Sequence, residues 1–126
     1  MKLYHLSPVK NLTELQPATP LDPRRPWGVY CTNYEHINAW TATLPGDHFY
    51  LYVIDIPKDE QVLFGEDNFS SMEYNEIQVK DIPQDISPKW CLEVVLQRPI
   101  PCQYIGTVYW DEIWRRWTHA TEPVPA

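Results

Sequence analysis

Alternating apolar and polar positions predict strands along most of the chain. The longest alternation runs from His48 to Ile56, and its apolar side chains on both faces indicate a central strand. Trp90 to Leu96 is a second long strand with the same character. Shorter strand patterns occupy residues 2–6, 28–32, 61–64, 74–80 and 104–109. Prolines crowd the connections, so we expect residues 9–27 to form an irregular surface loop.

Two short helices are predicted between these strands. The first follows Thr32 or Asn33, either of which suits an N-cap, and it ends before Pro45. The second begins at Asp111. We expect its apolar face to pack in the core rather than to stack on nucleic-acid bases. This face consists of Trp110, Ile113, Trp114 and Trp117.

Several strands with few helices favour an α+β fold made of two packed, mainly antiparallel sheets with one or two short helices. The length of 126 residues suits one domain, which we place over residues 1–120. We expect the chain to loosen from Thr118 onward, with residues 121–126 forming a flexible tail.

Composition narrows the choice of function. A formal net charge of −7 works against a nucleic-acid partner, because such binding usually rests on a basic surface. No window is apolar and long enough for a membrane span, and the first residues are too short and polar for a signal peptide, so we expect a cytoplasmic protein. The chain has three cysteines, Cys31, Cys91 and Cys102. They form no CxxC pair, so neither a disulfide framework nor a metal site is expected.

One glutamate stands at the start of the strand Tyr74–Lys80. Ile77 and Val79 alternate with polar residues, so Glu76 faces away from the apolar side. A glutamate in such a position is most often simply solvated. Partners elsewhere in the chain are needed to give it a chemical role.

Two further strands supply candidate partners. His5 lies in the first strand, and Tyr30 lies in the segment Gly28–Thr32. Together with Tyr-Asn-Glu-Ile at residues 74–77, these blocks resemble the His-Tyr-Glu class of ADP-ribosyltransferases, which includes poly(ADP-ribose) polymerases and diphtheria-type toxins. The resemblance spans most of residues 1–95, and it is built from short motifs.

The resemblance implies an ADP-ribosyltransferase-like fold with an NAD+ cleft between its sheets. It implies that the carboxylate of Glu76 stabilises the oxocarbenium-like ribose formed when nicotinamide leaves NAD+. His5 would hold the other ribose, Tyr30 would stack on the nicotinamide ring, and Ser7 would bond the nicotinamide side. Taken singly and without the resemblance, His5 is more typical of a hydrogen-bonded core histidine, and Tyr30 of a buried aromatic residue whose hydroxyl is bonded.

Two positions depart from the family pattern. Leu6 follows the histidine where the family usually has glycine, and Thr41 stands where a second stacking tyrosine is expected. Trp40 is the candidate for that second aromatic face, although a core role explains it equally well.

The activity that these residues imply is transfer of ADP-ribose from NAD+ to an unknown acceptor, or to water. A protein acceptor is favoured over a nucleic acid, and small domains of this family are often toxin-like effectors. The alternative is a non-catalytic module that keeps the fold and binds a nucleotide or a protein, which the departure at Leu6 motivates.

Overall fold

The computed structural model describes residues 1–20, 24–34, 37, 41, 46–66, 74–83, 92–111 and 116–121. This part of the chain is mostly β-structure, with one complete 3-10 turn over Val79–Asp81. Its strands are, in chain order, β1 (Lys2–Ser7), β2 (Glu14–Leu15), β3 (Val29–Cys31), β4 (His48–Asp55), β5 (Gln61–Glu66), β6 (Asn75–Gln78), β7 (Leu92–Leu96), β8 (Ile100–Pro101), β9 (Gln103–Asp111) and β10 (Arg116–Thr121).

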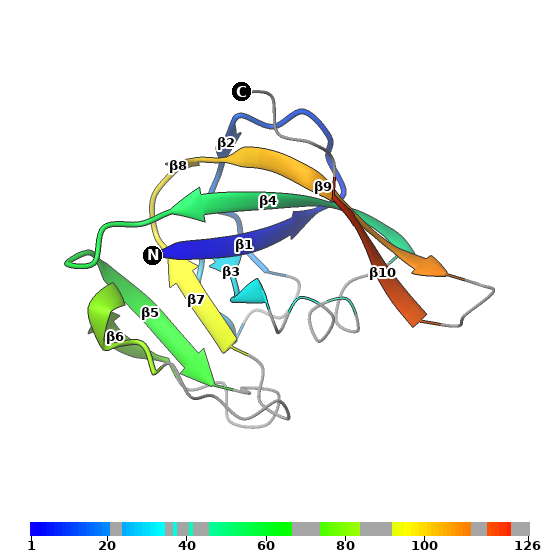
Figure 1. Cartoon of the computed structure of the whole chain (residues 1–126). Coiled ribbons are helices and arrows are strands. Elements are labelled where there is room, and N and C mark those ends of the chain that lie inside the picture. Colours follow the sequence, from blue (N-terminus) through cyan, green and yellow to red (C-terminus); the bar gives the residue numbers. More distant parts are fainter. Residues whose placement is uncertain are drawn as a thin grey trace.

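The strands form two four-stranded sheets and one small ribbon (Figure 1). The first sheet has the order β1-β4-β9-β10, and the second has the order β3-β7-β5-β6. β2 and β8 pair separately. Every strand pair is antiparallel, as predicted.

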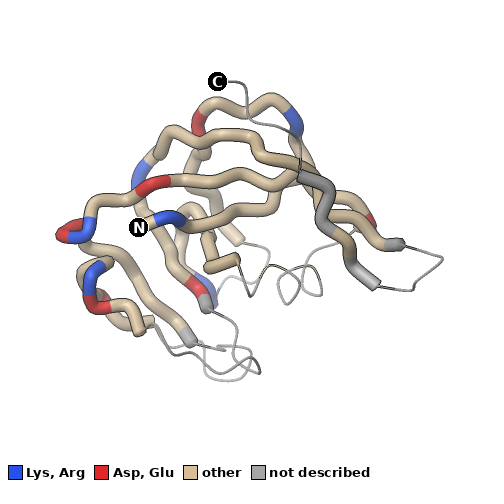
Figure 2. Tube along the Cα trace, viewed as in Figure 1, with Lys and Arg blue, Asp and Glu red and all other residues tan. Residues whose placement is uncertain are grey.

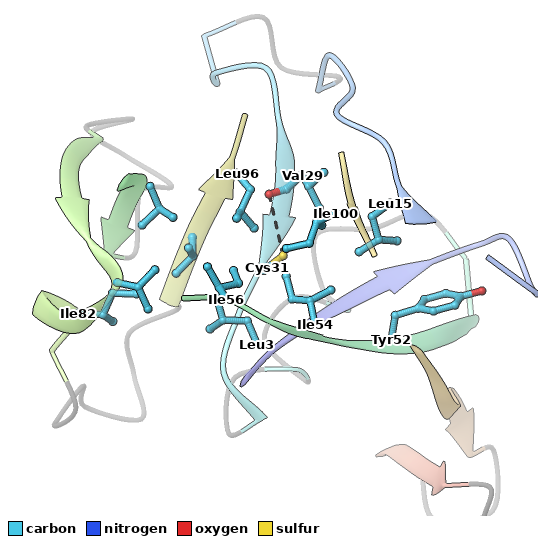
Figure 3. Close-up of a cluster of buried hydrophobic side chains, with 13 residues drawn as sticks. Leu3, Leu15, Val29, Cys31, Tyr52, Ile54, Ile56, Ile82, Leu96 and Ile100 are labelled. Atoms are coloured by element: carbon cyan, nitrogen blue, oxygen red, sulfur yellow. Dashed lines mark hydrogen bonds between the residues drawn. The ribbon is translucent and has the colours of Figure 1, made fainter. Parts of the chain in front are cut away.

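The main core lies between the two four-stranded sheets (Figure 3). Leu3 on β1 and Ile54 on β4 contribute from the first sheet, and Val29 on β3 and Leu96 on β7 contribute from the second. All four side chains are at most 2% exposed. The alternation of the sequence produces this arrangement, because every second residue of a strand faces the same side.

The opposite face of the first sheet is also covered. Phe49 and Leu51 on β4 pack there with Ile37, so β4 is apolar on both faces. The prediction of a central strand over His48–Ile56 is therefore confirmed, since β4 lies between β1 and β9.

The two four-stranded sheets are also joined directly at one corner. An antiparallel bridge links Tyr4 on β1 to Thr32, immediately after β3. The Tyr4 amide donates to the Thr32 carbonyl at 2.8 Å, and the Thr32 amide donates to the Tyr4 carbonyl at 2.9 Å. This junction brings His5 beside the strand that carries Tyr30.

The helix predicted to begin at Asp111, one of the two helices of the expected α+β fold, is wrong for the described residues. Asp111 ends β9, and Trp110 pairs with Trp117 across the β9-β10 hairpin. The seven-residue spacing of Trp110 and Trp117 fits one face of a helix, but it also fits two paired strands that are joined by a short connection. Aromatic and β-branched residues favour strands. The chain is likewise not loose from Thr118, because β10 continues to Thr121.

The helix predicted after Thr32 lies mostly outside the described residues, and so does Trp40. Ile37 and Thr41 are described, and both are buried. The described residues include no helix of the length and apolarity needed to cross a membrane. Acidic and basic residues are spread along the trace, without a continuous basic strand in the described part (Figure 2).

Candidate functional site

His5 and Tyr30, which the sequence placed 25 residues apart, are in contact at the junction of the sheets. His5 Nδ1 lies 2.6 Å from the carbonyl oxygen of Tyr30. Because a carbonyl only accepts, Nδ1 must carry the proton, and Nε2 of a neutral ring is left as an acceptor. Burial lowers the pKa of His5, against the opposing effect of the Tyr30 hydrogen bond. The imidazole is therefore held neutral, with one acceptor nitrogen for a ligand hydroxyl or amide.

A small cavity of about 70 Å³ lies at this contact. That volume is far below the roughly 300–1,000 Å³ of a complete ligand pocket, so the described lining accommodates at most a small part of a ligand. The described residues that line the cavity are Tyr4, His5, Leu6, Tyr30, Cys31, Thr32 and Ile37.

Thr32 is one of the lining residues, but its hydroxyl is sealed from a water-sized molecule. Its side chain is 3% exposed, and its hydroxyl Oγ1 has no hydrogen-bond partner among the described residues. A buried hydroxyl without a partner costs about 1–3 kcal/mol. The Cys31 thiol beside it is buried, and burial raises its pKa, so Cys31 is an inert thiol and not a nucleophile.

A second polar cluster lies on β7, next to β3. Glu93 is 2% exposed, and its Oε1 accepts from Nη1 of Arg25 at 2.5 Å. The same nitrogen lies 2.9 Å from the Tyr74 hydroxyl, which donates to Oε2 of Glu93. Both carboxylate oxygens of Glu93 are thus held in fixed directions by a guanidinium and a phenol.

Tyr30 links the cavity to this polar cluster. Tyr30 pairs with Val95, so its side chain shares a sheet face with Glu93, two residues before Val95. Burial, and then the charge of Glu93, raise the pKa of Tyr30 to about 12. Burial and the Glu93 hydrogen bond raise the pKa of Tyr74 as well. Both tyrosines therefore stay protonated at neutral pH, and Tyr30 donates to the carbonyl of Pro26.

Glu76 is on the strand that the sequence predicted, with its side chain exposed as expected. However, Glu76 pairs with Leu63, Leu63 pairs with Val95, and Val95 pairs with Tyr30, so Glu76 and Tyr30 lie on opposite edge strands. Three inter-strand spacings separate them, roughly 14 Å. The structure therefore brings His5 and Tyr30 together and leaves Glu76 apart from them.

Ser7 ends β1 and is buried, and its hydroxyl accepts from the amide of Val9 at 3.1 Å. It is not part of the cavity lining. Leu6 does line the cavity, although it belongs to the apolar cluster on the other face of the first sheet. Trp40 lies outside the described residues.

Sequence reasoning did not select Glu93, Arg25, Tyr74 or Thr32 as site residues. A signal existed for Glu93, because it shares its strand face with apolar Cys91 and Val95, which is unusual for a solvated glutamate. Its partner Arg25 could not be identified, since it comes from an irregular loop 68 residues away.

No family model, curated protein or solved structure matches this chain. Within the residues that the structure describes, no group of three or more His, Cys, Asp or Glu side chains is placed to hold a metal ion.

Proposed function

We propose that this protein is an ADP-ribosyltransferase that binds NAD+ at the junction of its two sheets. The observation that carries the proposal is the contact of the His5 ring with the backbone carbonyl of Tyr30, beside a small cavity. The resemblance assigns both residues to NAD+ binding. A neutral His5 that offers Nε2 as an acceptor is suited to a ribose hydroxyl. The ring of Tyr30, fixed by its hydrogen bond to Pro26, is suited to stacking.

The reaction needs a carboxylate close to these two residues. Loss of neutral nicotinamide builds positive charge on the ribose, and a fixed negative group lowers the energy of that state. Glu93 is on the strand next to Tyr30, whereas Glu76 is on the far edge strand. We therefore assign the charge-stabilising role to Glu93, and Glu76 remains the candidate that the sequence motif selects.

The contacts of Glu93 are compatible with this role. Each carboxylate oxygen has two lone pairs, so an oxygen that already accepts from Arg25 or Tyr74 has one lone pair left. Because Glu93 is 2% exposed and is not among the described residues that line the cavity, a ribose hydroxyl would reach that lone pair only after the side chains around Glu93 move apart. Arg25 and Tyr74 would act as positioning residues that hold the carboxylate. Arg25 also offsets part of the negative charge, so its distance from the ribose would set how strongly Glu93 acts.

The acceptor of ADP-ribose is a protein or water in this proposal, and the net charge of −7 disfavours nucleic acid. A cytoplasmic, toxin-like effector fits a small domain of this kind. The second candidate is a binding module without catalysis. The limited cavity beside Leu6 favours it, because only part of NAD+ fits within the described lining.

Incubation of the protein with NAD+ carrying a label in its adenylate half tests the proposal. Release of nicotinamide with label on a lysate protein supports transfer, and release with free ADP-ribose supports hydrolysis. NAD+ binding without nicotinamide release, with or without lysate, would favour the binding module. No NAD+ binding at all would reject the ADP-ribosyltransferase and leave only a module that binds another nucleotide or a protein.

A further inference from the structure

Arg25 is the more exposed partner in its ion pair with Glu93. The side chain of Arg25 is 14% exposed, and that of Glu93 is 2% exposed. Nη1 of Arg25 donates to Oε1 of Glu93 at 2.5 Å, and Oε2 accepts from the hydroxyl of Tyr74. A ligand hydroxyl would have to compete with these two donors for the carboxylate. The pair therefore keeps the charge of Glu93 compensated and its oxygens engaged.

The backbone that follows Arg25 is anchored at both of the next two residues. The Tyr30 hydroxyl donates to the carbonyl of Pro26, and Nε2 of Gln97 donates to the carbonyl of Trp27 at 3.1 Å. Because these anchors hold the backbone, the side chain of Arg25 is the part that can leave its carboxylate partner. Rotation between staggered rotamers is enough to turn a side chain of this length away.

A guanidinium that leaves a carboxylate is stabilised by another anion. An arginine binds phosphate oxygens in the same forked geometry as carboxylate oxygens, so a phosphate can replace the carboxylate with little change in the hydrogen bonds. Arg24, the preceding residue, is exposed and adds a second guanidinium to the segment. Two neighbouring arginines suit a diphosphate, and NAD+ carries one between its two riboses.

We propose that the Arg25–Glu93 pair is an autoinhibitory contact, which a ligand diphosphate opens by taking the guanidinium of Arg25. This inference rests on the proposed function. The exchange takes the positive charge away from Glu93 when NAD+ binds, while Tyr74 continues to hold the carboxylate. Without ligand, the closed pair weakens the binding of any diphosphate, because only molecules in the open state bind it.

Binding of inorganic pyrophosphate to the full chain, measured by titration calorimetry at constant ionic strength, tests this exchange. Glu93→Gln removes the charge that holds Arg25. Glu60→Gln is the matched control, because it removes the same charge from the partner of Arg98, which is 45% exposed. Glu93→Gln should bind pyrophosphate about tenfold more tightly than Glu60→Gln, since a hydrogen bond between charged groups no longer competes.

Two further variants keep the test decisive if Glu93→Gln does not fold. Tyr74→Phe removes a hydroxyl that contacts both members of the pair and leaves every charge in place, so it should raise the wild-type affinity for pyrophosphate about threefold. The double variant Arg25→Gln with Glu93→Gln removes both charges of the pair, so neither is left buried alone. It should bind pyrophosphate no more tightly than Glu60→Gln.

Equal pyrophosphate affinities of Glu93→Gln and Glu60→Gln, or no binding by either, would overturn the inference. A double variant that binds as tightly as Glu93→Gln would also overturn it, because Arg25 would then not hold the anion. If Glu93→Gln does not fold, a wild-type affinity in Tyr74→Phe has the same consequence. The proposed function is judged separately, by nicotinamide release from NAD+ by the wild type. The predicted pyrophosphate affinities in a protein that neither binds nor cleaves NAD+ would support the exchange at Arg25 and reject the ADP-ribosyltransferase.

Discussion

Two strands of the second sheet, the inner strand β7 and the edge strand β6, carry glutamates on the same face in opposite surroundings. Glu93, next to the β3 edge, is 2% exposed and held by Arg25 and Tyr74, whereas Glu76 on the β6 edge is exposed to solvent. The strand pattern treats both as polar positions of a strand. The two glutamates differ because only Glu93 is contacted by Arg25 and Tyr74, which come from distant parts of the chain. Tertiary contacts therefore decide which carboxylate is fixed.

The largest effect on stability is expected from Arg25→Ala. Removal of this guanidinium leaves Glu93 buried without its ion partner, and breaking a buried pair in this way costs about 3–5 kcal/mol. Arg98→Ala is the matched control, because Arg98 is 45% exposed in its pair with Glu60 and should cost less than about 1 kcal/mol. Urea unfolding of both variants measures the difference. Equal costs would mean that the Arg25–Glu93 pair is no better shielded than a surface pair.

A smaller loss is expected from Gly28→Ala, at the start of the β3 edge. A Cβ at this position would lie 2.4 Å from Cγ1 of Val95 and 2.8 Å from the carbonyl oxygen of Leu96, and the backbone atom cannot turn away. Overpacking of this kind costs about 1–3 kcal/mol. Gln61→Ala, at an exposed position of β5, should change the unfolding free energy by less than about 0.5 kcal/mol. A Gly28→Ala variant as stable as the wild type would contradict the close approach of β3 and β7.

The smallest of the three effects concerns pH. Burial lowers the pKa of His5 in the folded state, so the unfolded chain binds this proton more readily as pH falls below 6.5, the ordinary value. The neutral His5 therefore stabilises the folded state fully above pH 6.5. Below that pH, the unfolding free energy falls by at most about 1.4 kcal/mol per pH unit because of His5. Unfolding free energies at pH 7.5 and 5.5 should therefore differ less in His5→Gln than in the wild type. Identical pH dependence in the His5→Gln variant and the wild type would contradict a buried, neutral His5.

Local alternation was sufficient to predict most strands and both faces of β4, because burial follows a period of two in any sheet. It failed for residues 110, 111 and 116–121, because a seven-residue spacing of tryptophans suits a helix and a hairpin equally. Only pairing across the sheet, Trp110 with Trp117, distinguishes the two. The sequence also selected His5 and Tyr30 as site residues. The His5 ring contacts the backbone carbonyl of Tyr30, and the role of both residues in NAD+ binding stays a prediction.

Glu93 could not be selected from spacing. The importance of Glu93 depends on Arg25 and Tyr74, which approach it from a proline-rich loop and from the strand region before β6. Such contacts between distant parts of the chain leave no mark on the strand pattern.

The most direct test of the central claim compares nicotinamide release by Glu93→Gln and Glu76→Gln at the same protein and NAD+ concentrations. Both changes remove one negative charge and keep the shape of the side chain. Loss of a fixed charge-stabilising group lowers the rate about 100- to 1,000-fold, so the account predicts this loss for Glu93→Gln and a rate within about threefold of the wild type for Glu76→Gln. The reverse result, with Glu76→Gln inactive and Glu93→Gln active, would contradict it.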